Sequence, residues 1–200
     1  MHLKKHHTVL AAVSVAALLT LSACGADGAG PGAAGGGKAA TSSTEPQSVD
    51  AARMGDVMFA QMMIPHHEQA IEMADAALKK DASAEVKGLA AQIKAAQAPE
   101  IETMTTWLKE WNAPMSAEGG HGGHGGSDGM MSGDDMADLS SANGAAFDKM
   151  WLTMMIEHHE GAVEMAEGVL ETTTNPEVEE MAKAIVDGQK KEIAAMKGLL

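Results

Sequence analysis

Hydrophobic residues recur every three or four positions along much of the chain, with polar residues between them. In one stretch Met58, Met62 and Met73 fall within an arc of about 80° when successive residues are turned by 100°, together with His66 and Gln69. This spacing is typical of an amphipathic helix. A second stripe of the same kind follows it, made of Val86, Ala90, Ile93, Gln97, Glu100 and Met104.

The ends of the helices are marked as well. Ser83 stands before the second stripe, and Asn175 followed by Pro176 stands before a later one. Ser and Asn cap helix N-termini, and Pro is favoured at the first helical position. Pro65 and Pro99 lie inside helical patterns, so each is expected to kink its helix or to end it a turn early. The pattern predicts helices over 49–79, 84–111, 141–171 and 176–198.

The chain contains two copies of one pattern. The copies centre on His66-His67 and His158-His159, and the same offset of 92 positions relates Met104 to Met196. One helical hairpin cannot cover its own apolar face, so two hairpins related by a pseudo-twofold axis are expected to close a shared core. The predicted fold is all-α, a four-helix bundle of two duplicated hairpins. Its parts are repeat 1 at about 48–111, a long flexible loop at about 112–140 and repeat 2 at about 141–200.

Composition removes several other classes of protein. The chain has no Tyr, two Phe and an aromatic fraction of 2%, which disfavours a β-sandwich because strands are rich in aromatic residues. A net charge of −14 excludes a basic nucleic-acid surface and favours cationic ligands. The 17 Met residues in 200 are far above normal usage, so soft sulfur is the outstanding chemical feature of the chain.

The N-terminus has the order of an export signal. Lys4 and Lys5 precede an apolar run that is too short to span a membrane comfortably and that ends in Leu-Ser-Ala before Cys24. This sequence resembles a bacterial lipobox, which implies cleavage after residues 1–23 and lipidation of Cys24; simple cleavage nearby is the alternative. Two acyl chains would hold the protein stably at the outer face of the cytoplasmic membrane. Residues 24–47 are rich in Gly, Ala, Ser and Thr, so they are expected to form a disordered tether.

Methionine and histidine alternate at helical spacing around both His-His pairs. Met62 with His66 and Met63 with His67 are four residues apart, so thioether and imidazole lie side by side on one helix surface. Thioether is a soft ligand suited to Cu(I), and by the same softness to Ag(I), while imidazole binds both oxidation states of copper. The candidate ligands are Met62, Met63, His66, His67, Met73, Met154, Met155, His158, His159 and Met165.

The same residues have a plainer interpretation. A Met stripe is commonly core filler, and a buried His is commonly a hydrogen-bonded core residue. Adjacent His residues point about 100° apart, so His66 and His67 cannot both play the same packing role. On the second helices Glu100 and Glu192 fall on the inward stripe, beside Gln97 and Gln189. They are expected either to hydrogen-bond the imidazoles or to be ligands themselves.

The Gly-rich connection offers further donors. His-rich tracts often bind metal, and unstructured loops of this length are usually functional or disordered. The connection is therefore either a weak metal-capture segment or a solvated spacer. Its candidate donors are His121, His124, Met130 and Met131. By the same angular count Glu68, Glu72, Glu160 and Glu164 point away from the Met stripe and are expected to form a solvated face.

The doubled Met-x-x-x-His-His-Glu-x-Ala-x-x-Met pattern, with Gln-x-x-Glu-Ile-x-x-Met on the partner helix, resembles the bacterial domain-of-unknown-function 305 family. The resemblance covers about residues 48–200. It implies a ferritin-like four-helix fold, export or membrane anchoring, and a role in copper binding and resistance. Carried over by position, it points to Met62, His66, His67 and Met73, and to Met154, His158, His159 and Met165. Gly161 replaces the Gln found at Gln69, so the two halves need not bind alike.

Three functions compete at this point. The first is a non-catalytic lipoprotein that sequesters Cu(I) or passes it to a partner protein. The second is a ferritin-like oxidoreductase with a two-metal centre from His66, His158, Glu100 and Glu192, although the Glu-x-x-His signature of di-iron bundles is absent. The third is an interaction module whose Met-rich face receives a peptide or apolar ligand. The residues favour the first.

Overall fold

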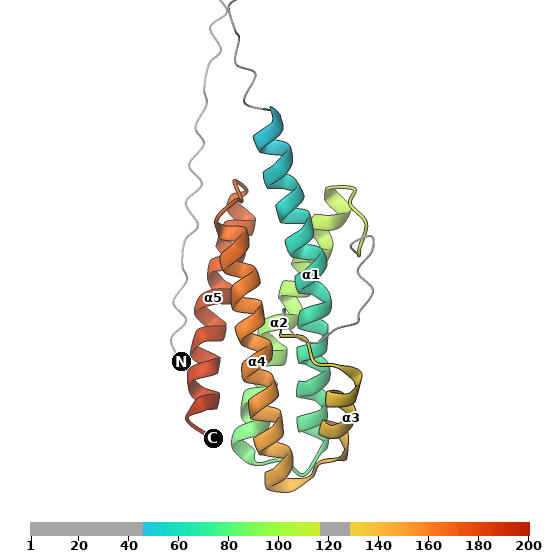
Figure 1. Ribbon diagram of the computed structural model, residues 1–200, viewed down its shortest axis with the longest axis vertical. Coiled ribbons are helices and arrows are strands. Elements are labelled where there is room, and N and C mark those ends of the chain that lie inside the picture. Colours follow the sequence, from blue (N-terminus) through green and yellow to red (C-terminus); the bar gives the residue numbers. More distant parts are fainter. Residues whose placement is uncertain (1–45, 117–128) are drawn as a thin grey trace, which may run out of the picture. The chain divides into compact units, whose positions relative to one another are not determined.

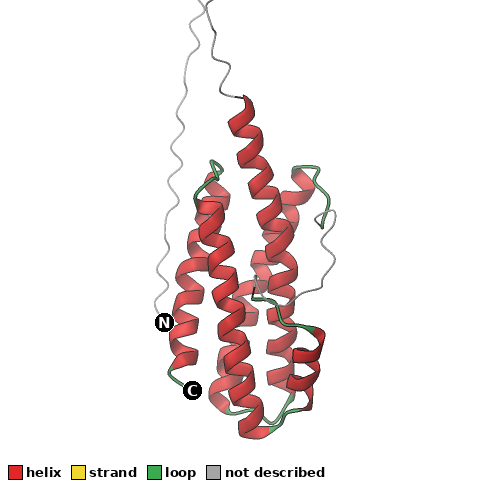
Figure 2. Cartoon of the chain, in the orientation of Figure 1, coloured by secondary structure: helices red, strands yellow, loops and turns green. Residues whose placement is uncertain are grey.

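A computed structural model describes residues 46–116 and 129–200, and all of the secondary structure within them is helical. Figure 1 shows the path of the chain and Figure 2 shows its helices and turns. The helices are α1 (Pro46–Lys79), α2 (Ala84–Glu110), α3 (Gly133–Ser141), α4 (Gly144–Leu170) and α5 (Pro176–Lys197). The predicted all-α fold is confirmed.

The predicted caps stand where the helices begin. Ser83 accepts a hydrogen bond from the Val86 amide at 3.3 Å, and Asn175 accepts one from the Glu177 amide at 3.0 Å. Of the two outcomes expected at Pro65 and Pro99, an early helix end does not occur, because α1 and α2 continue through both. A kink at each proline stays a prediction. Both prolines are exposed, and packing on either side of them sustains each helix despite the amide that proline lacks.

The long helices form two hairpins that meet through their first members. α1 packs on α2 and α4 packs on α5, while α1 and α4 lie against each other and join the hairpins. The second half of α1 shares a cluster with the first half of α4, so these two helices run antiparallel, as Figure 1 shows. This is the pseudo-twofold arrangement that the repeat predicts.

Two apolar clusters fill the bundle, one toward each end of the helices. One combines the end of α1 with the start of α4, around Met73 and Trp151. The other combines the start of α1 with the end of α4, around Met63 and Ala162. Between the two clusters each long helix contributes buried polar residues at one level. These are His66 and His67 on α1, Gln97 on α2, His158 and His159 on α4, and Gln189 on α5.

Polar contacts at repeat-related positions tie each hairpin to the turn of the other. The Asp148 carboxylate on α4 accepts two hydrogen bonds from the Ser83 amide, at 3.2 and 3.1 Å. Its counterpart Asp56 on α1 is hydrogen-bonded to Thr173 in the turn before α5, and burial raises the pKa of Asp56. The Trp151 indole donates to the Met73 carbonyl at 2.9 Å, which closes the α1–α4 contact.

The connection between the hairpins departs from expectation. A flexible loop over 112–140 is wrong for its last part, because Gly133–Ser141 forms α3. Ser132 and Asp135 make a reciprocal capping box at its start, and Leu139 is 1% exposed in the core. Composition suggested a spacer, but one buried Leu and a strong cap are enough to dock a short helix.

The segment before α3 is held close to the helices. The Gln69 amide group both donates to the Met131 carbonyl, at 2.9 Å, and accepts from its amide, at 2.8 Å. Gly129 has φ +70°, and a Cβ there would lie 2.6 Å from the Glu157 carbonyl and 3.1 Å from the Gly161 Cα. The difference between Gln69 and Gly161 therefore has a structural reason: one clamps this segment, and the other makes room for it.

Several predictions fall on residues outside those described. They concern the signal at 1–23, lipidation of Cys24, most of the tether at 24–47, and His121 and His124. Among the residues that are described, none of the helices has the length and apolarity needed to cross a bilayer.

Gly129→Ala should destabilise the folded protein. The substitution places a side chain at positive φ and against a backbone oxygen, so we expect a loss of about 1–3 kcal/mol in the free energy of unfolding. Urea denaturation measures the loss, and faster hydrogen exchange at the Met131 amide would locate it. Gly188→Ala, in open space on α5, is the control and should be neutral or stabilising. Equal effects of the two substitutions would contradict the prediction.

Candidate metal centre

Four histidines lie fully inside the bundle, at its midpoint. His66 is 1% exposed, and His67, His158 and His159 are 0% exposed. The rings of His66 and His158 meet across the α1–α4 contact, with centroids 3.7 Å apart and planes inclined by 40°. Because consecutive helical residues point about 100° apart, the second histidine of each pair is turned toward the partner helix of its own hairpin. The two pairs thus divide their roles as the sequence suggested.

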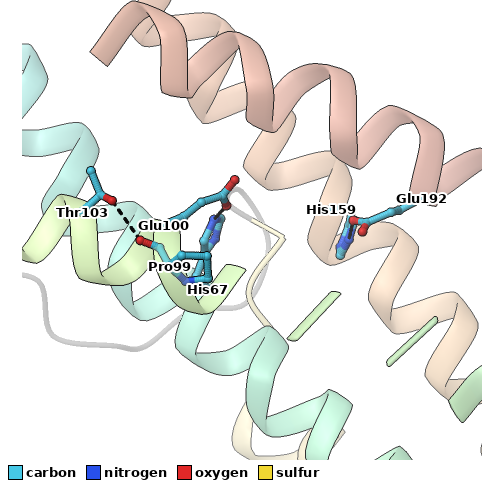
Figure 3. A network of polar contacts seen from close by, with 6 residues as sticks. All are labelled: His67, Pro99, Glu100, Thr103, His159 and Glu192. Atoms are coloured by element: carbon cyan, nitrogen blue, oxygen red, sulfur yellow. Dashed lines mark hydrogen bonds and ion pairs between the residues drawn. The ribbon is translucent and has the colours of Figure 1, made fainter. Parts of the chain in front are cut away.

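Each of these second histidines meets a carboxylate. His67 Nε2 donates to Glu100 on α2 at 2.8 Å, and His159 Nε2 donates to Glu192 on α5 at 2.9 Å. Figure 3 shows the two pairs on their separate hairpins. The side chains of Glu100 and Glu192 are 23% and 19% exposed, so each carboxylate keeps some contact with water. Of the two expectations for these residues, the hydrogen bond to an imidazole is present; direct ligation stays a prediction.

The carboxylates leave one nitrogen on each of these rings. Within the part of the chain that is described, Nδ1 of His67 and Nδ1 of His159 are buried and have no hydrogen-bond partner, and the same holds for both amide atoms of Gln97. Buried polar atoms without partners are costly, so a native protein retains them where a ligand or water completes them. Around a metal-bound histidine, a carboxylate usually accepts a hydrogen bond from one imidazole nitrogen, and the other nitrogen offers its lone pair to the metal.

The electrostatics of the layer keep His158 neutral. Burial lowers its pKa well below the ordinary value, and the neighbouring imidazoles of His66, His159 and His67 lower it further. A neutral imidazole offers a lone pair, which is the form that coordinates a metal.

The candidate methionines separate into two groups. Met63, Met73 and Met155 are fully buried and Met154 is 8% exposed, whereas Met165 is half-buried and Met62 is 38% exposed. The predicted stripe is therefore wrong at its start, since Met58 is 50% exposed too. The reason is tertiary: only part of this face of α1 is covered by other helices, and Met63 rather than Met62 points into the core beside the histidines.

The two-metal centre considered for an oxidoreductase is not assembled. It requires Glu100 and Glu192 to join His66 and His158, but both carboxylates contact the other histidine of each pair. Nowhere in residues 46–116 or 129–200 do three or more His, Cys, Asp or Glu side chains gather as a metal-holding group.

The structure also describes two further sets of residues that the sequence singled out. The four glutamates Glu68, Glu72, Glu160 and Glu164 are exposed, which confirms the solvated face. Met131 is fixed through its backbone to Gln69 and its side chain packs on the core, while a role as a metal donor stays a prediction. Met130 is half-buried. The turn contacts of Asp56 and Asp148 were not predicted. The signal for them was that Asp occupies the same position in both repeats, 92 residues apart.

Comparison with known proteins identifies the family. The model of the domain of unknown function DUF305 matches residues 56–200, which is most of the chain. The protein belongs to the DUF305 family. The resemblance noted in the sequence is thereby confirmed. No protein with a curated functional description matches this DUF305 chain.

Solved structures agree with the assignment. A DUF305 protein of Streptomyces coelicolor is 32% identical, with a TM-score of 0.67 over 73% of this chain and 91% of that one. The protein CopM in its Cu(I)-bound form is 34% identical, with a TM-score of 0.61 over 72% of this chain and 94% of CopM. CopM has also been solved in Cu(II)-bound and Ag-bound forms, at 36% and 35% identity.

The metal-free protein should lose stability as the pH falls below about 6.5. The unfolded chain takes up a proton on His158 near its ordinary pKa of 6.5, whereas the folded chain, with a lowered pKa, does not. Neutral His158 makes its full contribution to the free energy of unfolding above that pH. Below it, the free energy of unfolding falls by at most about 1.4 kcal/mol per pH unit. Urea denaturation between pH 7.5 and pH 5 measures the slope, and His158→Gln should flatten it. Parallel slopes for the two proteins would contradict the assignment to His158.

Proposed function

We propose that this DUF305 protein is a non-catalytic, extracytoplasmic copper-binding protein that holds Cu(I), and by the same chemistry Ag(I), at the buried histidine layer. The observation that supports it most is the pair of carboxylate-oriented imidazoles, His67 with Glu100 and His159 with Glu192. In each, the nitrogen left over is buried and without a partner among the described residues. Two repeat-related donor sets follow, one on each hairpin.

The donor set favours a soft monovalent ion. Met63 lies four residues before His67 and Met155 four residues before His159, and both thioethers are fully buried. Neutral sulfur and neutral nitrogen suit Cu(I). The buried oxygens of the described layer are the amide oxygens of Gln97 and Gln189, which are too few for the all-oxygen coordination that Mg²⁺ or Ca²⁺ requires. The central His66–His158 contact lies within the same layer, so both hairpins contribute to one polar core.

The comparisons give the proposal an independent basis. CopM, which shares this family's fold over most of both chains, has been solved with Cu(I), Cu(II) and Ag. The N-terminal sequence supports export and attachment to the outer face of the cytoplasmic membrane through lipidated Cys24. Outside the cytosol thioethers are suitable ligands, because free thiols there are oxidised to disulfides. The protein would sequester copper or pass it to a partner.

Removal of the four imidazoles should abolish tight Cu(I) binding. We expect the variant with His66, His67, His158 and His159 changed to Ala to lose stoichiometric binding in an oxygen-free titration against a competing chelator. Circular dichroism establishes that the variant is folded. Should it unfold, the substitutions of Glu100 and Glu192 described next still test the proposal, since they leave every imidazole in place. Wild-type binding no tighter than that of the variant would mean that the histidines are core packing.

Neutralising the two orienting carboxylates should weaken binding without removing a ligand. The double substitution Glu100→Gln and Glu192→Gln keeps the side-chain shape but loses the charge that holds each imidazole, so Cu(I) affinity should fall by about 10- to 100-fold. Glu68→Gln with Glu72→Gln is the matched control, because it also removes two negative charges, from carboxylates that are exposed on α1. An equal change in both double variants would point to general electrostatics instead of orientation.

A further inference from the structure

The repeat leaves one seam of the α1–α4 contact open. A groove of about 260 Å³ lies between the first half of α1 and the second half of α4. Three of its lining side chains are thioethers, from Met58 and Met62 on α1 and Met165 on α4. Met58 is 50% and Met62 38% exposed, and Met165 is half-buried. The hollow gives thioethers from two helices access to solvent, so it is a candidate site for a soft ligand.

The other copy of this seam is filled between the two helices, although Met150 and Met154, the counterparts of Met58 and Met62, line a separate hollow of about 370 Å³ that involves α4 and no residue of α1. The offset of 92 positions relates Gly55, which lines the groove, to Phe147, which is fully buried, and relates exposed Met62 to Met154, which is 8% exposed. Helix α3 adds Leu139 to the same cluster as Phe147 and Met154. Lys80 then binds the carbonyls of Ser140 and Ala142 at the end of α3, at 2.5 and 2.8 Å.

The open seam is therefore a product of residue choice. A Gly at position 55 stands where the second repeat places an aromatic ring, and the space beside it is bounded by Thr172, 3.4 Å from the position that a Cβ would take. Among the described residues the seam has no covering helix of its own like α3 at the filled end. Thioethers thus stay accessible on a protein whose net charge of −14 draws cations toward its surface.

We infer that Met58, Met62 and Met165 form a second soft-metal site, free of histidine, that takes Ag(I) or Cu(I) from solution at the surface of the bundle. The site goes beyond the buried layer of the proposed function and is independent of it. Soft, polarisable sulfur from two helices supplies the donors, and none of them carries a proton to lose. Binding at the seam is consequently insensitive to pH in the range where imidazole titrates.

The test is an Ag(I) titration of the purified protein followed by native mass spectrometry at pH 7 and pH 5. Met58, Met62 and Met165 are all changed to Leu, which keeps their size while removing the sulfur. The variant should bind one Ag(I) fewer than wild type at both pH values. Met54→Leu with Met115→Leu is the control, because these exposed methionines lie outside the groove. Cys24 is common to all variants, so any ion that it binds cancels.

A second variant tests the location without removing a ligand. Gly55→Phe introduces the ring that the other repeat carries, so it should fill the groove and lose the same single Ag(I) ion. Thermal melting establishes that the fold is retained. Equal Ag(I) stoichiometry in wild type and the triple Leu variant would overturn the site, as would full binding by folded Gly55→Phe. Loss of the seam ion at pH 5 in wild type would show that imidazole holds it, and would also overturn the proposal.

Discussion

The contact between His66 and His158 is the constraint around which the bundle is organised. It places two imidazoles, 3.7 Å apart between centroids, on the pseudo-twofold axis where α1 crosses α4. A polar layer at this point divides the apolar core into two clusters, and apolar packing alone would not fix how far one hairpin slides along the other. Buried polar groups have few arrangements that satisfy them, so the layer specifies the register of the hairpins. The Glu100 and Glu192 contacts extend that specification to α2 and α5.

The asymmetry between the repeats is as informative as their likeness. Gln69 on α1 hydrogen-bonds the segment before α3, whereas its counterpart Gly161 on α4 has no side chain and leaves space for that segment. Gly55 lines the groove between α1 and α4, whereas its counterpart Phe147 is buried in the core at the other end of the contact. The two repeats thus share the buried histidine layer, while single residue differences between them give the two ends of the α1–α4 contact different surfaces.

Much of this could be predicted from sequence because the repeat doubles every signal. The caps at Ser83 and Asn175, the helical periodicity and the inward position of Glu100 and Glu192 depend on local spacing, which the chain displays directly. The exposure of Met58 and Met62 could not be predicted in this way. A helical stripe gives the face of a helix but not how much of that face a neighbour covers. The docking of α3 could not be predicted for a related reason. The composition of the connection is rich in Gly, and the burial of Leu139 depends on the helices that it contacts.

The way in which the hairpins meet has a thermodynamic consequence. Because they join chiefly through α1 and α4, their association is in effect the dimerisation of two similar subunits carried on one chain. The crossover from α2 to α4 then sets an effective concentration of one hairpin at the other, and any ion that gains donors from both hairpins raises the occupancy of the associated state. The coupling applies where donors come from both hairpins, as in the proposed seam site: a tighter association of the hairpins would retain the ion better, and their separation would release it.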